Sequence, residues 1–339
     1  MLRVLVPRRI SPHRPDGDAA LLRFTGRSMG CEWSVCAATA AGTDRARLAA
    51  GTSATLDGVV RQMSTWESDS AIARFNRAPA GSWLPLPAEF ATVLACALRV
   101  ADASAGALDP TAGGLVTLWG FGATGRHHQA GFAPPGADAL DAARRLCDWQ
   151  RLEVDAEAGR IYQPGGVQLD LSAVAKGFGV DEVCRYLGSQ GIDHCLVDVG
   201  GELRGAGVKP DGQPWWVEVQ EAVAAATAPL RIALHDLAVA TSGAGLQHYR
   251  HAGRRYSHCI DPRSGHPIDN GVTSVTVLHD QCMEADAWST ALMVLGVPQG
   301  LALAERHGLA ARLLVRSGDG VAEHLTGAFR ELLVPPRRP

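Results

Sequence analysis

Helical and strand-like apolar patterns follow one another in this chain without strict alternation, and this order constrains the fold more than any other sequence feature. Two short apolar runs, Ala20–Phe24 and Glu32–Ala37, flank a glycine-containing connection, which is typical of a β-hairpin. A helical stripe follows over Thr43–Met63, with Thr43 as its expected N-cap, and a second helix is predicted to begin near Pro87. Residues 194–240 indicate a series of strands joined by glycine turns. The sequence therefore predicts the α+β class, with mixed or antiparallel sheets flanked by helices.

Composition indicates one globular unit. Hydrophobic residues make up 46% and charged residues 20% of the 339 residues, which allows a buried core and excludes disorder for the bulk of the chain. The formal net charge of −3 supplies no general basic field to hold nucleic acid, so we expect no nucleic-acid partner. Without an internal repeat or a clear linker, we expect a single domain over residues 19–335. The Pro- and Arg-rich residues 1–18 are expected to be loose.

Targeting signals are absent from the printed residues. The N-terminus has neither an apolar stretch of signal-peptide length nor a small-residue cleavage site. The longest uncharged stretch, Ala287–Ala304, contains Ser, Thr, Gln, Gly and Pro, so no transmembrane segment is predicted. The eight cysteines form no C-x-x-C pair and show no zinc-type spacing with histidine. Because scattered free thiols suit a reducing compartment, the sequence predicts a cytoplasmic protein, and a mis-set start would leave the periplasmic side open.

Two glycine motifs resemble catalytic turns but lack the required context. Gly26–Gly30 matches G-x-S-x-G, yet the strand pattern of Cys31–Cys36 follows it, whereas a nucleophile elbow opens a helix. Gly120–Gly125 matches G-x-G-x-x-G, but Pro134 and Pro135 exclude a regular helix after it. We therefore interpret the first motif as a turn between strands. The second is part of a glycine-rich segment, Leu108–Gly125, that we predict to be a loop or a buried turn.

An anion-binding pattern surrounds Asp170 and Lys176. Asp170 lies in an apolar run, Val167–Leu171, that is predicted as a short strand, and Lys176 lies in the helix expected after it, to about Leu187. Helix N-termini attract anions through unpaired N–H groups, and a lysine adds a point charge. The same pattern also fits an N-cap followed by a solvated lysine.

A second pair of polar residues suggests a metal site. A predicted strand, Val272–His279, leads into a predicted helix, Glu284–Leu295, in which Asp286 and Thr290 are four residues apart and share one face. One carboxylate and one hydroxyl suit Mg²⁺, which keeps several waters and takes further ligands from substrate phosphates. The alternative is structural, with Asp286 in the first helical turn and the Thr290 hydroxyl bonded to the backbone.

The segment Tyr256–Gly265 contains a candidate proton-transfer residue. A strand ends there in an Asp-Pro turn, and His258 follows Tyr256 by two positions, which places both on the same strand face. A single histidine in such a place is either structural or a group that exchanges protons near neutral pH. Both interpretations stay open from these residues alone.

Six blocks of the chain stand in an order that is very hard to obtain by chance: Ser28–Gly30, Met63–Asn76, Leu108–Gly122, Leu169–Asp181, Ala240–Gly243 with His258–Gly265, and Val275–Leu292. Together they resemble the FAD:protein FMN transferase family, the ApbE-type flavin transferases. The resemblance extends from about Phe24 to Gly296. It implies a T-fold-like α+β domain that uses Mg²⁺ to move FMN from FAD to a Thr or Ser hydroxyl of an acceptor protein, forming a phosphoester and releasing AMP.

The resemblance also implies roles for individual residues. Asp286 and Thr290 resemble metal ligands, together with the backbone carbonyl of Ala173. We assign catalysis to His258, Lys176 and Asp286, with His258 or a carboxylate of the site as the expected base. The ring of Trp66 suits stacking on the flavin nucleotide. The expected FAD-binding residues are Met29, Trp66, Leu108, Asp109, Pro110, Thr111, Asp170, Lys176, His258 and Ile260.

A related activity uses the same site. An FAD pyrophosphatase would hydrolyse FAD to FMN and AMP, with water in place of the protein hydroxyl, and the sequence separates the two activities poorly. Trp66 favours retention of FAD and hence transfer. For the transferase, the expected partners are FAD and an acceptor protein that carries a Ser/Thr-Gly-Ala-Thr motif.

Overall fold

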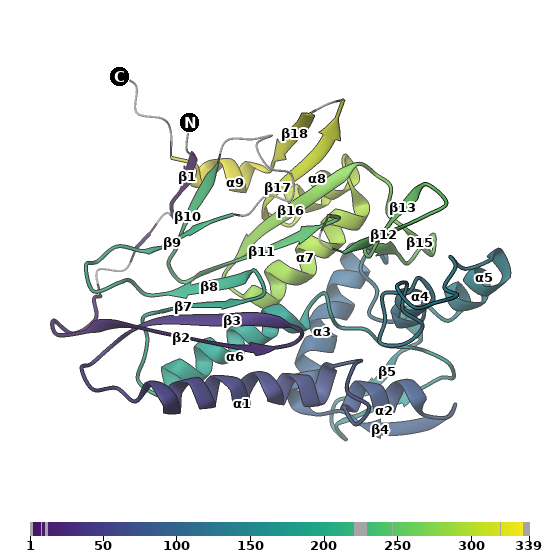
Figure 1. Ribbon diagram of the computed structural model, residues 1–339, viewed down its shortest axis with the longest axis horizontal. Helices are drawn as coiled ribbons and strands as arrows, with labels where there is room; N and C mark the ends of the chain where they lie inside the picture. The colour runs from purple at the N-terminus through teal and green to yellow at the C-terminus, as the bar shows by residue number, and fades with distance from the viewer. Residues whose placement is uncertain are drawn as a thin grey trace.

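An antiparallel sheet of eight strands runs through the middle of the computed structural model, which describes residues 3–7, 9–10, 13–219, 229–245, 247–318 and 320–334 (Figure 1). The strand order is β18-β17-β16-β11-β8-β7-β3-β2, and every neighbouring pair is antiparallel. This sheet confirms the α+β class. Its strands are β2 (Ala20–Ser28), β3 (Cys31–Thr39), β7 (Cys195–Val199), β8 (Glu202–Ala206), β11 (Leu237–Gly243), β16 (Val272–His279), β17 (Ala310–Ser317) and β18 (Gly320–Leu325).

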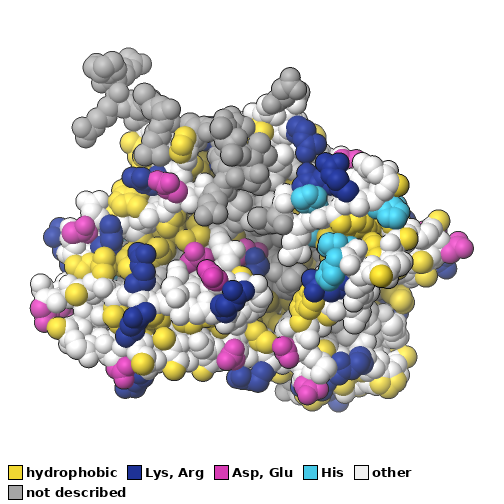
Figure 2. All heavy atoms as spheres, in the orientation of Figure 1, with side chains coloured by type: hydrophobic (Ala, Val, Ile, Leu, Met, Phe, Trp, Pro, Cys, Tyr) yellow, Lys and Arg dark blue, Asp and Glu magenta, His cyan; other side chains and the backbone are white. Residues whose placement is uncertain are grey.

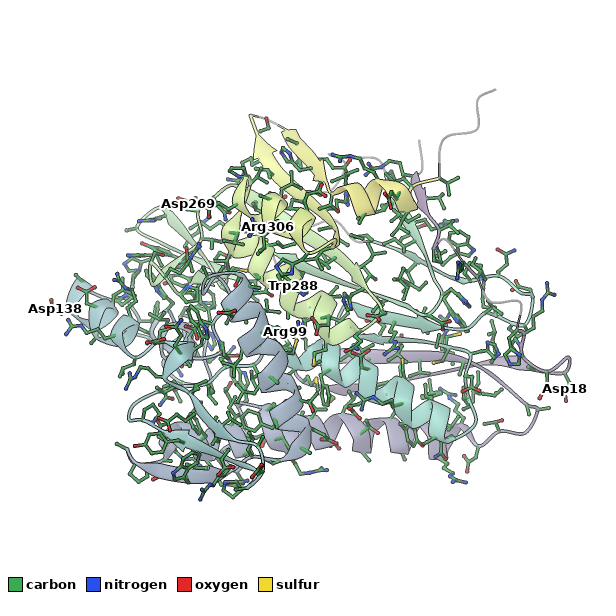
Figure 3. The ribbon with its side chains drawn as sticks, turned by 180° about the vertical axis from the view of Figure 1, so that it is seen from behind. Asp18, Arg99, Asp138, Asp269, Trp288 and Arg306 are labelled. Atoms are coloured by element: carbon green, nitrogen blue, oxygen red, sulfur yellow. The ribbon has the colours of Figure 1, made fainter. Side chains whose placement is uncertain are left out.

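Long helices cover the sheet. Helices α6 (Ala175–Ser189) and α7 (Cys282–Leu295) pack on its strands, while α1 (Arg45–Met63) packs against α6 and α3 (Ala88–Ala103) packs against α7. Apolar side chains fill the space between these elements. Arg99 of α3 forms an ion pair with Glu284 of α7, and Figure 3 shows Arg99 and Trp288 where these two helices meet.

The start of α1 differs from the prediction. Asp44, not Thr43, is the N-cap, because its carboxylate accepts a hydrogen bond from the Arg47 N–H at 3.0 Å. The Thr43 hydroxyl donates to the Ala40 carbonyl at 2.8 Å instead. A carboxylate is the stronger cap here, since it also interacts favourably with the helix dipole.

The hairpin of β2 and β3 confirms the predicted strand pair and is longer than expected. Its turn consists of Met29 and Gly30, with φ of +52° and +74°. Two residues at positive φ are typical of a type I′ turn, which matches the twist of the flanking strands. The G-x-S-x-G motif thus ends in a strand-to-strand turn. Residues 120–125 form turns and a bend and do not open a helix.

Residues 108–125 and 167–171 depart from the sequence prediction. The first segment contains a helix, α4 (Gly113–Leu118), where only a loop or buried turn was expected. The second forms no strand, since it makes a single bridge between Gln168 and Ala112. The Asn76 side chain takes the place of a partner strand: it accepts from the Leu169 N–H at 2.7 Å and donates to the Leu169 carbonyl at 2.9 Å.

Part of the N-terminal segment is ordered. Strand β1 (Arg3–Leu5) pairs in parallel with β10 (Leu230–Leu234), which pairs with β9 (Trp215–Glu218). The prediction that residues 1–18 are loose is therefore wrong for residues 3–5, because Leu5 is buried in an apolar cluster with strands far away in the sequence.

No helix among the described residues has both the length and the apolar character needed to cross a membrane.

The remaining elements surround this framework. The other elements are α2 (Ala71–Arg77), α5 (Ala137–Arg145), α8 (Gln299–Arg306), α9 (Gly327–Leu332), the short η1 (Trp149–Arg151), and the small sheets of β4 (Ser82–Pro85), β6 (Arg160–Gln163) and β5 (Glu153–Asp155), of β12 (His248–His251) and β13 (Arg254–Ser257), and of β14 (Ile260–Asp261) and β15 (His266–Pro267).

Candidate active site

Helix α6 meets the start of α7 at Gly177, and this close approach places the residues of the candidate site. A Cβ atom built on Gly177 would lie 2.3 Å from the Cys282 carbonyl oxygen and 2.8 Å from the Met283 nitrogen. Only glycine leaves room for two backbones at this separation. The N-terminal turns of the two helices are therefore held against each other.

Asp181, one turn further along α6, caps α7. Its two carboxylate oxygens accept from the N–H groups of Cys282 at 3.1 Å and Met283 at 3.0 Å, and Arg204 of β8 donates to it at 2.5 Å. Helix α7 has no side-chain cap of its own at Gln281. The sequence contained Asp181 in a recognised block but gave no sign of this role, because the capped helix is far away along the chain.

Asp286 lies in the second turn of α7 and is buried. Its Oδ2 accepts a hydrogen bond from the Gly177 N–H at 3.0 Å. Burial raises the pKa of Asp286, while the charge of Lys176 and the Gly177 bond act in the opposite direction. A cation bound at Asp286 would offset the cost of burying its negative charge.

The Ala173 carbonyl belongs to the turn just before α6. In a regular helical turn, the Gly177 N–H would bond to it, but this N–H donates to Asp286 instead. Among the described residues, no backbone hydrogen bond to the Ala173 oxygen is present. A carbonyl in this position is free to act as a ligand.

Thr290 lies one turn after Asp286 in α7, as the spacing predicted. The Ser242 hydroxyl of β11 is 3.1 Å from the Thr290 hydroxyl and 2.7 Å from that of Ser289. The Thr290 hydroxyl therefore contacts a side chain of β11, whereas the structural interpretation of the sequence predicted a hydrogen bond to the backbone of its own helix. Ser242 thus orients the Thr290 oxygen.

Lys176, whose side chain is 35% exposed, forms an ion pair with a buried carboxylate that the sequence did not indicate. Its Nζ donates to Oε1 of Glu202, the first residue of β8, at 2.6 Å. Although burial alone would lower the pKa of Lys176, the charges of Glu202 and Asp286 raise it, so the ammonium stays protonated. Burial and the nearby Asp286 raise the pKa of Glu202, whereas Lys176 lowers it.

The residues present fit a divalent cation. Two buried carboxylates, Asp286 and Glu202, face one ammonium, and Oε2 of Glu202 is buried without a hydrogen-bond partner among the described residues. Asp286, Thr290 and Ala173 offer oxygen atoms as possible metal ligands, and oxygen is the ligand atom that Mg²⁺ prefers. No cluster of three or more His, Cys, Asp or Glu able to hold a metal occurs in the described part of the chain.

Asp170 and residues 108–111 lie side by side. The Asp170 N–H donates to the Pro110 carbonyl at 2.8 Å, and the Asp170 carboxylate accepts from the Ser172 N–H at 2.8 Å. Asp109 is buried and accepts from both the N–H and the hydroxyl of Thr111, at 2.8 and 2.6 Å. Burial raises the pKa of Asp109. These side chains shape the two segments, and Leu108 belongs to the main core.

His258 follows β13 and is half-buried. Its Nδ1 is 3.0 Å from the Gln247 carbonyl, so Nδ1 carries the proton and Nε2 is the acceptor, with the Cys259 Sγ 3.8 Å from it. Burial lowers the pKa of His258; the Gln247 bond opposes this shift, and the charge of Lys176 adds to it. Ile260, two residues later, is buried in a cluster with Leu115 and Trp119.

Met29 and Trp66 occupy different surroundings. The Met29 side chain lies against α6, since a Cβ on Gly179 would be 3.0 Å from its Cε. Trp66 is 54% exposed, and the Arg126 guanidinium lies 4.9 Å from its ring centre. No hydrogen bond or ring contact between described residues joins Trp66 to Lys176, Glu202 or Asp286, so its flavin contact stays a prediction.

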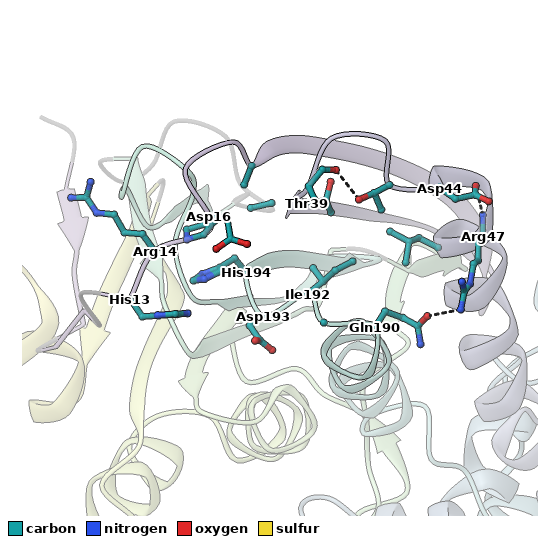
Figure 4. Close-up of a pocket in the computed structure, with 17 residues that line it drawn as sticks. His13, Arg14, Asp16, Thr39, Asp44, Arg47, Gln190, Ile192, Asp193 and His194 are labelled. Atoms are coloured by element: carbon teal, nitrogen blue, oxygen red, sulfur yellow. Dashed lines mark hydrogen bonds between the residues drawn. The ribbon is translucent and has the colours of Figure 1, made fainter.

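A separate cavity of about 380 Å³ contains none of the predicted site residues (Figure 4). It lies between the 13–19 segment, the end of β3, the start of α1 and the turn at 190–194. His13 stacks on His194 there, with ring centres 5.3 Å apart. Neither Asp286 nor Lys176 lines this cavity, so we assign it no part in the proposed reaction.

Known proteins are similar to this chain in sequence and in fold. A model of the ApbE family matches residues 29–313. The FAD:protein FMN transferase of Vibrio cholerae serotype O1 is 38% identical over 279 residues, which cover 82% of each chain. That of Klebsiella pneumoniae is 34% identical over 331 residues, covering 96% of this chain and 92% of the relative.

Solved structures agree with these relatives. The apo crystal structure of the Pseudomonas stutzeri flavinyl transferase ApbE has a TM-score of 0.84 and 38% identity, and the match covers 93% of this chain and 97% of that one. The flavin transferase ApbE from Vibrio cholerae also has a TM-score of 0.84, with 35% identity and coverage of 93% and 99%. The chain therefore belongs to the ApbE family.

Proposed function

We propose that this chain is an FAD:protein FMN transferase that depends on Mg²⁺ and acts on a Thr or Ser hydroxyl of an acceptor protein. The acceptor oxygen forms a bond to the FMN phosphorus, and the bond from that phosphorus to the bridging oxygen breaks. AMP leaves with the bonding electron pair, and the hydroxyl proton passes to a base. The observation that carries the proposal is the pair of buried carboxylates, Asp286 and Glu202, beside Lys176 in a chain of this family.

Lys176 supplies fixed positive charge for the phosphates. The Glu202 ion pair holds its Nζ in place, and the raised pKa keeps it charged at neutral pH. An ammonium beside the pyrophosphate reduces the repulsion that an approaching oxygen meets and stabilises charge on the departing phosphate. We infer that Glu202 is a positioning residue, since it acts through Lys176.

Asp286, Thr290 and the Ala173 carbonyl are the proposed Mg²⁺ ligands. A bound Mg²⁺ would supply Lewis-acid stabilisation of the phosphate oxygens. The protein prepares this oxygen set in advance: Gly177 fixes one Asp286 oxygen, and Ser242 fixes the Thr290 hydroxyl. Preorganised ligands lose little freedom when a cation binds.

His258 is the proposed base. Its lowered pKa keeps the ring neutral at pH 7, and the Nδ1 bond to Gln247 leaves Nε2 to accept the acceptor hydroxyl proton. Lys176 is near enough for its charge to influence His258. This proximity supports a shared reaction site for the phosphate-binding lysine and the base.

The remaining predicted residues would hold FAD. Asp170 and the 108–111 segment are tied through the Pro110 carbonyl, and they form one wall of the proposed FAD site. Met29, at the hairpin turn, would contribute apolar surface, and Ile260, buried against Leu115 and Trp119, would support the site from the core side. The half-exposed ring of Trp66 offers a flat face for stacking on the nucleotide.

Covalent labelling of a peptide tests the proposal. The protein is incubated with FAD, Mg²⁺ and a peptide that contains Ser-Gly-Ala-Thr or Thr-Gly-Ala-Thr, and the peptide is examined by mass spectrometry. We expect a mass gain of one FMN less one water, an equal amount of AMP, and loss of both with EDTA. FMN and AMP without a labelled peptide would instead favour the pyrophosphatase, and no FAD turnover at all would contradict both activities.

We further propose that the reaction takes place in the cytoplasm. All eight cysteines are free thiols, which suits a reducing compartment. Fractionation of cells with an antibody against the protein would test this, and recovery in the periplasmic fraction would contradict it.

A further inference from the structure

The β12–β13 hairpin concentrates positive charge that has no acidic partner in the part of the chain that the structure describes. Arg250, Arg254 and Arg255 are exposed on it, together with His248 and His251. The chain contains no Asp or Glu from residue 237 to residue 260. None of the three arginines takes part in an ion pair between described residues. For a chain of net charge −3, this is an unusual local excess of cations.

The strand register brings like charges face to face. Arg250 lies directly opposite Arg255, and Tyr249 lies directly opposite Tyr256 on the other face of the two strands. Directly opposed like charges destabilise a pair of strands. The hairpin keeps this arrangement although no described carboxylate offsets it, which points to an anionic group supplied from outside the chain.

The tyrosine face braces the hairpin against the rest of the molecule. Tyr249 stacks on Tyr256 with ring centres 5.1 Å apart, and Tyr256 stacks on Trp119 at 5.3 Å. His127 covers Tyr249 at 5.0 Å. With one face packed in this way, the opposite face presents Arg250 and Arg255 outward on a fixed support.

The base of the hairpin is joined to the candidate active site. The His258 N–H donates to the Gln247 carbonyl at 3.2 Å, across the two chain ends that enter and leave the hairpin. Arg255 also donates to the Ala244 carbonyl at 3.1 Å. In the space-filling view, Lys, Arg and His side chains gather on the side of the molecule where Figure 1 draws β12, β13 and β15 (Figure 2). A partner held by this face would lie next to His258.

We propose that the outer face of the β12–β13 hairpin is the docking surface for an acidic segment of the acceptor protein. This inference rests on the proposed transferase function, because it names the surface that brings the acceptor hydroxyl to His258. Complementary charges steer such a segment to the site and select against acceptors without acidic flanks. The proposal predicts that acceptor preference depends on Arg250 and Arg255, while FAD binding does not.

Two peptides and two double variants of the protein test the docking surface. Both peptides carry Ser-Gly-Ala-Thr, one with flanking Asp and Glu and the other with Asn and Gln at the same positions. We expect wild-type protein to have a KM for the acidic peptide about tenfold lower at low salt, and Arg250→Gln with Arg255→Gln to remove most of this difference without changing kcat or FAD affinity. The matched control, Arg23→Gln with Arg45→Gln, removes two exposed charges from β2 and α1 and should keep the wild-type preference.

Charge reversal separates docking from a structural role. Arg250→Glu with Arg255→Glu should prefer a peptide with flanking Lys over the acidic peptide, an effect that loss of folding does not produce. Binding of labelled peptides, measured by fluorescence anisotropy without FAD, tests the surface even if no transfer takes place, so failure of the proposed function stays distinguishable.

The docking proposal would be overturned by equal KM values for both peptides with wild-type protein, by an unchanged preference in the Gln variant, or by no change of preference on charge reversal. A Gln variant that keeps its peptide affinity but loses binding to phosphatidylglycerol vesicles would also overturn it, in favour of a membrane contact.

Discussion

At the scale of single residues, the candidate site is a small set of charges held in a buried place. Burial raises the pKa values of the Asp286 and Glu202 carboxylates. The positive charge of Lys176 acts in the opposite direction and stabilises their ionised forms. Removing one member of such a set leaves another charge without its partner. Variants that keep shape while changing charge are therefore the informative ones.

Asp286→Asn should separate cation binding from folding. The amide oxygen can still accept the Gly177 hydrogen bond, whereas the charge proposed to attract Mg²⁺ is lost. We expect kcat/KM for peptide labelling to fall by at least about a hundredfold, because the proposed metal ligand and its negative charge are removed. The control, Asp57→Asn on the exposed side of α1, should keep full activity. A wild-type rate with Mg²⁺ in Asp286→Asn would refute the ligand assignment.

The pH profile of kcat/KM should report the neutral form of His258. Because the pKa of His258 is lowered, the ring is already neutral at pH 7, so the contribution of His258 to the rate should be constant at higher pH and fall as the ring takes up a proton in more acidic solution. His258→Asn should lower the rate by about 10²–10⁴-fold and remove this acidic limb. A profile unchanged by the substitution would exclude His258 as the base.

At the scale of secondary structure elements, the contact of α6 with the start of α7 decides whether the site exists. Gly177 allows the close approach, and Asp181 uses the same approach to cap α7. The Ala173 turn and Asp286 meet only because these two helices touch. A change at this contact should therefore affect stability and activity together.

Gly177→Ala should destabilise the protein and impair transfer. Its Cβ would collide with the Cys282 carbonyl, and the two backbones would have to separate at a cost of about 1–3 kcal/mol in the free energy of unfolding. Gly188→Ala in the same helix is the matched control, since the nearest atom to its Cβ is 3.9 Å away. The control should be neutral or about 0.5–1 kcal/mol more stable, because alanine favours the helix. Urea unfolding of both variants measures the difference, and equal stabilities would contradict the packing argument.

At the scale of the whole molecule, the candidate site joins parts that are distant in the sequence. Helices α6 and α7 carry Lys176 and Asp286, strands β8 and β11 carry Glu202 and Ser242, and the segment after β13 carries His258. Ligands that bind across such a junction hold these parts together. Their effect should be visible in the stability of the complete chain.

Mg²⁺ and FAD together should raise the melting temperature by several degrees. A ligand at about 100 times its Kd adds roughly 2.7 kcal/mol when it binds the folded state alone. Scanning calorimetry with both ligands, with each alone, and with EDTA measures the effect. We expect the shift from the pair to exceed the sum of the separate shifts, and the excess to be absent in Asp286→Asn. Strictly additive shifts would contradict a shared site.

Local patterns in the sequence determined much of this protein. The β2–β3 hairpin, the strand Val272–His279 and the α+β class follow from apolar spacing and turn residues, and the six ordered blocks indicate the ApbE family. The prediction for Thr43 was wrong by one residue, because neighbouring side chains compete for the same helix end. The catalytic, metal-binding and FAD-binding roles assigned to single residues, those of Asp286, Lys176 and His258 included, stay predictions.

Tertiary structure alone decided which distant groups meet. Glu202 as the partner of Lys176, Asp181 as the cap of α7 and Ser242 as the partner of Thr290 all join residues far apart along the chain. Asn76 replaces a partner strand beside residues 167–171, and Leu5 is buried against β10, for the same reason. Periodicity reports which face of an element is apolar, whereas the partner of a buried charge or an unpaired backbone group depends on how the whole chain packs.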